Sequence, residues 1–176
     1  MKFCALILCL LLGCAGSSSS AVRELDIRIV KGALSFREAE ALELAIQTLF
    51  QLPVFLSFEE DDLCAVPFER WKGRINCFLR FPERNIVYIT PPLIDVNGTE
   101  WLAGEASGIC ERGVAWVSVK QKFIDADTVK NAVAHEVGHL LGAEDGETEG
   151  LMRPDPYNSE FFMSEKSLSE IERCRG

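Results

Sequence analysis

Residues 135–145 read HExxHxxGxxD, and this run contains both histidines of the chain, His135 and His139. Two histidines four residues apart on a helix lie on one face, one turn apart, so both imidazoles can bind one metal ion. Gly142 allows the chain to turn sharply after the helix, and such a turn can bring Asp145 back as a third ligand. The run therefore requires a fold in which a helix is followed at once by a loop that returns to it.

The acidic residue inside the run, Glu136, follows the first histidine directly. There it can take a proton from a water held by the metal and pass it to a leaving amine. Three protein ligands with one water form the catalytic type of zinc site, so the sequence predicts one Zn²⁺ ion held by His135, His139 and Asp145. The alternative is a helix whose histidines are hydrogen-bonded core residues. The turn at Gly142 and the oxygen ligand after it favour the metal site.

The composition is that of a globular chain with an acidic surface. Of the 176 residues, 48% are hydrophobic and 26% are charged, which predicts one folded domain. The formal net charge of −9 argues against nucleic acid or an anionic membrane as an electrostatic partner. No feature of the sequence predicts an oligomer, so we expect a monomer.

Residues 1–20 are typical of a targeting segment. Lys2 precedes an apolar run over residues 3–12, which is too short to span a bilayer and predicts a signal peptide. Leu-Leu-Gly before Cys14 resembles the bacterial lipobox, in which the cysteine is lipidated, and the serines after it would form a flexible tether. The other interpretation is ordinary cleavage in the Ala-Gly-Ser stretch. Residues 21–176 are then expected to be a catalytic domain outside the cytoplasm, either secreted or attached to the membrane only through the lipid.

Four cysteines remain after the signal region, an even number for an exported domain: Cys64, Cys77, Cys110 and Cys174. We expect them to form two disulfides. Three connectivities are possible, and we favour Cys64–Cys77 as a local loop with Cys110–Cys174 as a long-range bridge. A structural zinc on four cysteines is disfavoured, because no CxxC pair occurs in this part of the chain.

Hydrophobic patterning predicts a mixed α/β (α+β) layer with a helix packed beneath a sheet. Ser35 followed by Glu38 is a capping box that starts the first helix, and Pro53 must end it. Asp125 or Asp127 can cap the helix that carries the histidines. The expected strands are 25–30, 54–58, 75–79, 86–90, 101–106 and 114–119, and a last helix covers 164–174.

The HExxHxxGxxD run, followed by a turn that contains Met152, resembles the metzincin clan of zinc endopeptidases. The third ligand of that clan is usually His, and Asp145 resembles the minority that use Asp. The resemblance implies a mostly parallel twisted sheet with an active-site helix and a C-terminal helix. It also implies that Met152 forms an apolar floor beneath the histidines, whereas the alternative is an ordinary core methionine.

Three further segments, 49–54, 104–106 and 113–119, resemble an archaemetzincin-type chain, as does the overall spacing. The sequence departs from that type because it lacks the second zinc on four cysteines. The pairing of Cys110 with Cys174 instead resembles adamalysin-like metzincins. Both resemblances imply that an extended peptide adds to the strand at 101–106 by main-chain hydrogen bonds.

Several residues near the run have two interpretations. Tyr157 either assists the metal site or packs, and packing is favoured because its distance from the Met-containing turn is longer than usual. Glu144 either replaces Asp145 as the third ligand or belongs to a solvated acidic loop. Phe161 and Phe162 either line a specificity pocket or belong to the core.

These observations lead to the hypothesis of an exported zinc endopeptidase that hydrolyses peptide bonds with an activated water. The rival hypothesis is a catalytically silent binding module of the same fold, such as a surface lipoprotein. Glu136 discriminates between them, because a decayed enzyme has little need of a carboxylate at this position. A metal-free structural helix is the third hypothesis, and it predicts that a chelator changes nothing.

Overall fold

The computed structural model describes residues 24–65, 70–71, 74–80, 85–101, 103–107, 113–119, 126–154 and 160–175. The predictions for residues 1–20, Cys110 and Tyr157 fall outside this part of the chain. The described helices are α1 (Phe36–Phe50), α2 (Arg74–Phe78), α3 (Ala126–Leu140) and α4 (Glu165–Arg175). The described strands are β1 (Leu25–Val30), β2 (Val54–Glu59), β3 (Ile86–Thr90), β4 (Leu93–Ile94), β5 (Glu100–Trp101), β6 (Ala103–Ser107) and β7 (Val114–Ser118).

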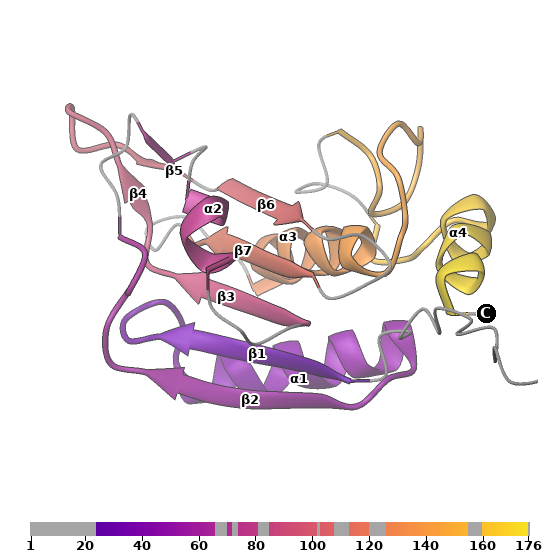
Figure 1. Cartoon of the computed structure of the whole chain (residues 1–176), viewed down its shortest axis with the longest axis horizontal. Helices are drawn as coiled ribbons and strands as arrows, with labels where there is room; N and C mark the ends of the chain where they lie inside the picture. Colours follow the sequence, from indigo (N-terminus) through magenta and orange to yellow (C-terminus); the bar gives the residue numbers. More distant parts are fainter. Residues whose placement is uncertain are drawn as a thin grey trace, which may run out of the picture.

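A mostly parallel sheet forms the centre of the fold, with the strand order β2-β1-β3-β7-β6 (Figure 1). Neighbouring strands are parallel except β6 and β7, which are antiparallel, so the sheet ends in an antiparallel edge strand. The strands β4 and β5 form a separate antiparallel ribbon. The predicted mixed, mostly parallel α/β sheet is therefore confirmed.

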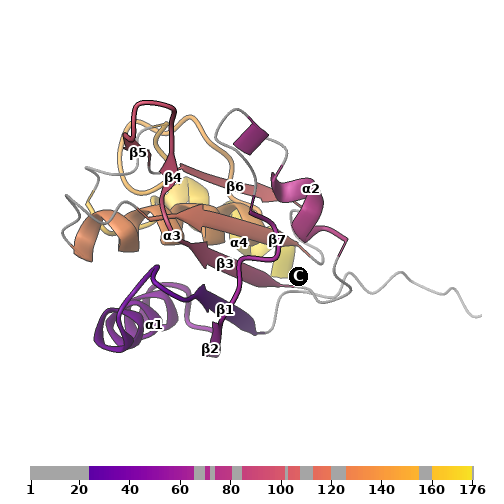
Figure 2. The ribbon, with the colours of Figure 1, turned by 90° about the vertical axis from the view of Figure 1, so that its left-hand side faces the viewer.

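Both faces of the sheet are covered. Figure 2 shows α1 and α3 on one side of the strands and α2 on the other. The side chains of β3 and β7 alternate between a large core against α1, α3 and α4 and a smaller core against α2. Every described residue of these two strands is buried, as expected for parallel strands with both faces packed.

The first helix begins and ends as its sequence predicts. The Ser35 hydroxyl accepts a hydrogen bond from the Glu38 N–H, and the Glu38 carboxylate accepts one from the Ser35 N–H, so the capping box is confirmed. Ala39, Leu42 and Ile46 lie on one side of α1 and enter the large core. Gln51 ends the helix in a left-handed conformation, two residues before the proline.

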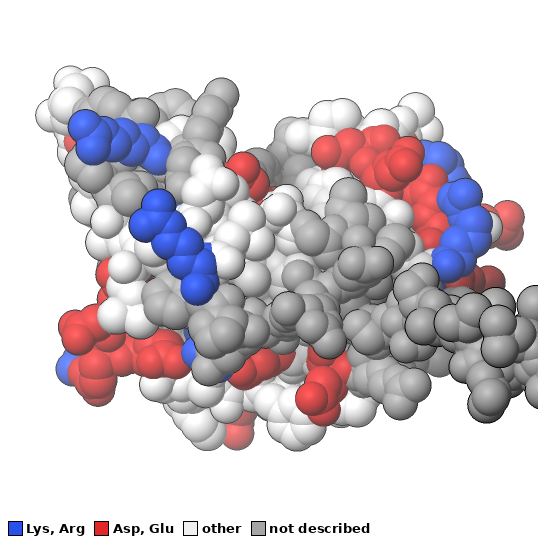
Figure 3. Space-filling view, viewed as in Figure 1, with Lys and Arg blue, Asp and Glu red and all other residues white. Residues whose placement is uncertain are grey.

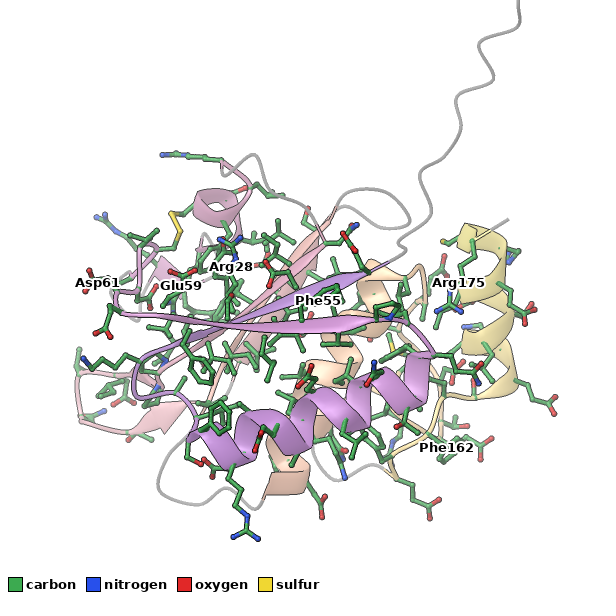
Figure 4. The ribbon with its side chains drawn as sticks, turned by 90° about the horizontal axis from the view of Figure 1, so that it is seen from below. Arg28, Phe55, Glu59, Asp61, Phe162 and Arg175 are labelled. Atoms are coloured by element: carbon green, nitrogen blue, oxygen red, sulfur yellow. A yellow bond between two sulfur atoms is a disulfide. The ribbon has the colours of Figure 1, made fainter. Side chains whose placement is uncertain are left out.

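The last helix is attached to the first one. Arg175 donates a hydrogen bond of 2.7 Å to the main-chain carbonyl of Phe50, where α1 ends (Figure 4). Such a bond satisfies a carbonyl that a helix end leaves without a partner. Met163, just before α4, and Ile171, within it, belong to the large core. The α4 region is therefore held by packing as well as by this hydrogen bond.

The expectation of a strand at 75–79 is wrong, because this stretch is the short helix α2. Ile75 and Phe78 are both buried in the smaller core. Three residues apart, they share one face of a helix, whereas in a strand they would point to opposite faces. The apolar spacing therefore fits one turn of helix better than a strand.

Two boundaries also differ from expectation. The strand expected at 101–106 is divided, because β5 pairs with β4 in the ribbon while β6 pairs with β7 in the main sheet. Of the two expected caps of α3, Asp127 lies within the first turn, and Asp125 lies outside the described residues. The Asp127 carboxylate pairs with Lys130 at 2.6 Å, and a negative charge near the helix N-terminus is favourable.

The local disulfide Cys64–Cys77 is present and joins the loop after β2 to α2. Cys174 also belongs to a disulfide, and its expected partner Cys110 lies outside the described residues. Beside the first bridge, Arg74 forms an ion pair with Asp62 and lies over the ring of Trp116 at 5.0 Å. Within the described part of the chain, no helix has the length and apolar character needed to cross a membrane.

Replacing Cys64 and Cys77 together by Ala should lower the free energy of unfolding by up to about 3 kcal/mol, because the bridge restricts a short loop of the unfolded chain. Denaturant unfolding of the oxidised protein measures the change, with Cys174 left in place. A loss below about 0.5 kcal/mol, the usual size of a surface substitution, would show that packing alone holds α2 in place.

Candidate metal centre

The histidines lie on α3, a helix whose residues 131–138 are all buried. Val133 and Val137 enter the large core, and they fix the rotation of the helix beneath the sheet. His135 and His139 then lie one turn apart with ring centroids separated by 4.6 Å. His135 is only 8% exposed, so the centre is recessed on its helix side.

Three potential ligand atoms meet after α3. The Nε2 atoms of His135 and His139 lie 3.1 Å apart. The Oδ1 atom of Asp145 lies 3.4 Å from each of them. All three atoms fall within 4.8 Å of one another, and no other described residues form such a group of three. The loop thus brings Asp145 back to the two histidines, as the sequence predicts.

The Nδ1 atom of each histidine ring is hydrogen-bonded to a main-chain carbonyl. His135 Nδ1 lies 2.8 Å from the Leu151 carbonyl oxygen, and His139 Nδ1 lies 2.9 Å from the Ala143 carbonyl oxygen. A carbonyl can only accept, so each Nδ1 carries a proton, and in its neutral form such a ring presents a lone pair at Nε2. Burial lowers the pKa of His135, which favours its neutral form.

When both rings are neutral, two imidazole lone pairs and a carboxylate oxygen face one another. Such a set is unfavourable by itself and is stabilised by a cation. Nitrogen and carboxylate ligands suit Zn²⁺, and histidines that bind a metal usually donate their other N–H to a carbonyl or carboxylate. The residues present thus fit a zinc ion.

The turn after α3 is a Schellman motif. The Ala143 N–H donates to the Gly138 carbonyl and the Gly142 N–H donates to the His139 carbonyl. Gly142 has a φ of 101°, a conformation that side chains with a Cβ rarely adopt. This turn places the Ala143 carbonyl where it meets His139.

Met152 lies directly beneath the histidine-bearing turn of α3. It is fully buried, and a Cβ added to Gly138 would come 2.6 Å from its Sδ atom. Gly138 thus allows the thioether to approach the helix backbone between His135 and His139. The apolar floor that the metzincin resemblance implies for Met152 stays a prediction.

Glu136 extends from α3 toward the edge strand β6. A Cβ added to Gly104 would lie 2.4 Å from Glu136 Oε1, so the carboxylate rests against the strand backbone. The pKa of Glu136 is raised to about 8, first because burial disfavours the charged carboxylate and then because Asp145 and Glu105 add negative charge nearby. A cation at the three ligand atoms would favour the ionised form.

The remaining predicted residues do not join the ligand group. Glu144 is exposed, as the solvated interpretation expects. Phe161 packs against the large core, and Phe162 is half-buried with its main chain bonded to Leu151. Acidic side chains gather over the loop that follows α3 (Figure 3).

Sequence reasoning missed several contributions to the centre. Gly138 has a visible signal, because glycine inside a helix costs about 1 kcal/mol relative to alanine and needs a packing reason. The carbonyls of Ala143 and Leu151 have no signal in the sequence, because every residue has a main-chain carbonyl. Gly104 has no signal in the sequence either, since the Glu136 carboxylate that lies against it is distant in sequence.

No protein-family model matches the chain, and no curated protein is similar to it in sequence. The fold is similar to that of archaemetzincin from Archaeoglobus fulgidus, complexed with malonate, with a TM-score of 0.63 and 16% identity over 84% of this chain and 99% of that chain. It is also similar to a zinc-dependent peptidase from Methanocorpusculum labreanum, with a TM-score of 0.55 and 16% identity over 83% and 99% of the two chains. These likenesses show that the chain has an archaemetzincin-like fold.

Replacing Gly138 by Ala should lower the free energy of unfolding by about 1–3 kcal/mol, because the added methyl overlaps Met152. In a Met152→Ala background only the Met163 Cε atom remains close to the added methyl, at 3.3 Å, so the same substitution should cost less than in the wild type. Denaturant unfolding with a chelator present measures both changes without a contribution from metal binding. Equal costs in the two backgrounds would contradict the contact.

Proposed function

We propose that this chain is a zinc-dependent endopeptidase that hydrolyses peptide bonds with an activated water. The observation that carries the proposal is the meeting of three potential metal-ligand atoms, from His135, His139 and Asp145. Its structural neighbours, an archaemetzincin and a zinc-dependent peptidase, support the same function.

In this proposal His135, His139 and Asp145 hold one zinc ion. When bound, zinc supplies Lewis acidity, which lowers the pKa of water and polarises a peptide carbonyl. Glu136 accepts the proton of the attacking water and then delivers it to the leaving amine. Its burial against β6 shields the carboxylate from bulk water. Water is the nucleophile, so no bond forms between substrate and protein.

The substrate in this proposal is a peptide or protein segment in extended conformation. The outer edge of β6 supports it, because none of the strands that the structure describes pairs with that edge. An extended segment could add there by main-chain hydrogen bonds, close to Glu136. The acidic rim of the neighbouring loop argues against nucleic acid as a partner.

The proposed location is outside the cytoplasm, either secreted or anchored through a lipid at Cys14. The apolar run at 3–12 and the disulfide Cys64–Cys77 support export. The disulfide state of Cys174 supports the second, adamalysin-like bridge to Cys110. We propose a monomer.

Purified protein should bind one zinc ion and cleave an unfolded protein substrate. A chelator should abolish cleavage and added zinc should restore it. Glu136→Gln should keep the zinc and lose about 10²–10⁴-fold in kcat, because the amide cannot accept the proton. Metal analysis and a peptide-release assay on both proteins measure these effects. Zinc binding without any cleavage by the wild type would instead favour the catalytically silent binding module.

Gly104→Ala should lower cleavage on the order of 10²-fold, because the new Cβ would displace the Glu136 carboxylate. Zinc affinity should stay unchanged, since Gly104 touches none of the three ligands. Ser107→Ala on the same strand is the matched control and should retain full activity. Wild-type cleavage by a folded Gly104→Ala variant would show that the carboxylate needs no such clearance.

A further inference from the structure

The peptide group that joins Ala143 to Glu144 is held from two sides. Its carbonyl oxygen, on Ala143, accepts the hydrogen bond from His139 Nδ1 at 2.9 Å. Its N–H, on Glu144, donates to Glu170 Oε2 at 3.0 Å. One rigid planar group therefore lies between a histidine of the metal centre and a carboxylate of α4.

Glu170 is an unusual residue for a surface helix. It is 6% exposed, although its helix neighbours Lys166 and Arg173 are 56% and 74% exposed. Its Oε1 atom faces these cations at 3.3 and 3.9 Å, and Oε2 faces the loop. Ion pairs at the surface contribute little and need no buried carboxylate, so the bond to the loop is the better reason for its burial.

A carboxylate that accepts from an N–H polarises the peptide group and makes its carbonyl a stronger acceptor. A stronger acceptor fixes the ring of His139 and increases the basicity of its Nε2 atom. The same peptide group also leads directly to Asp145, the next residue along the chain. Two of the three ligand atoms therefore depend on where this group is held.

We propose that Glu170 is a positioning residue of the metal centre, which acts on His139 and Asp145 through the Ala143–Glu144 peptide group. This inference rests on the proposed zinc function of the same site. His135 offers an internal comparison, because its Nδ1 atom bonds to a different carbonyl, that of Leu151.

The test uses the full chain labelled with ¹⁵N-histidine. The chain has only two histidines, so long-range ¹H–¹⁵N spectra contain only the imidazoles of His135 and His139. Spectra of the zinc-free and zinc-loaded protein are compared for the wild type, Glu170→Ala and Glu170→Gln. Glu172→Ala, an exposed acid on the same helix, is the matched control for the charge change.

Glu170→Ala should shift the signals of His139, leave those of His135 unchanged and raise the zinc Kd by about 10- to 100-fold. Glu170→Gln keeps an acceptor oxygen, so it should shift the His139 signals less and raise the zinc Kd less than Glu170→Ala does. Glu172→Ala should match the wild type. If Glu170→Ala does not fold, the proposal requires Glu170→Gln to show a smaller shift confined to His139.

Wild-type His139 signals and zinc affinity in a folded Glu170 variant would overturn the inference, even if the melting temperature falls. Equal shifts of both histidines would also overturn it, because they would indicate general loosening. The His139 signals of the zinc-free protein are measured without metal and without a cleavage assay. A wild type that binds zinc but cleaves nothing would therefore count against the proposed function alone, while the role of Glu170 would still be decided.

Discussion

The hydrogen bonds from the two histidines to main-chain carbonyls are the interactions on which the centre depends. They direct both Nε2 atoms toward Asp145, and in the neutral form of the rings these atoms offer lone pairs to a metal ion. Both carbonyls belong to the segment after α3, at Ala143 and Leu151. The path of this segment therefore sets the orientation of both histidine rings as well as the place of Asp145.

The rest of the fold can be understood as the support of that segment. The helix α3 is fixed by its apolar face beneath the sheet. The loop is fixed at its start by the turn at Gly142, at its end by buried Leu151 and Met152, and from outside by α4. The sheet contributes β6, whose backbone lies against Glu136. Rigid elements thus surround a loop that has little regular structure of its own.

Much of this arrangement is predictable from the sequence, because local patterns specify it. The capping box at Ser35, the strand at 86–90 and the turn at Gly142 depend on a few adjacent residues. The convergence of His135, His139 and Asp145 follows from helix geometry and the same turn. These features need little knowledge of the rest of the chain.

The features that sequence reasoning missed depend on contacts between distant segments. The stretch around Ile75 is helical because its apolar residues meet the sheet on one side, and a five-residue helix is too short to show a clear period. The burial of Glu170 depends on the N–H of a residue 26 positions earlier. An acidic residue in a polar helix is ordinary in sequence, and only the packed loop gives it a partner.

The attachment of α4 to the loop has a consequence for the order in which a ribosome makes the parts of the centre. The histidines and Asp145 leave the ribosome before the helix that carries Glu170 and before Arg175, which ties that helix to the end of α1. A nascent chain that has reached Met152 contains every ligand but lacks this support. The loop that carries Asp145 would therefore reach its final position late in synthesis, once α4 can bond to it.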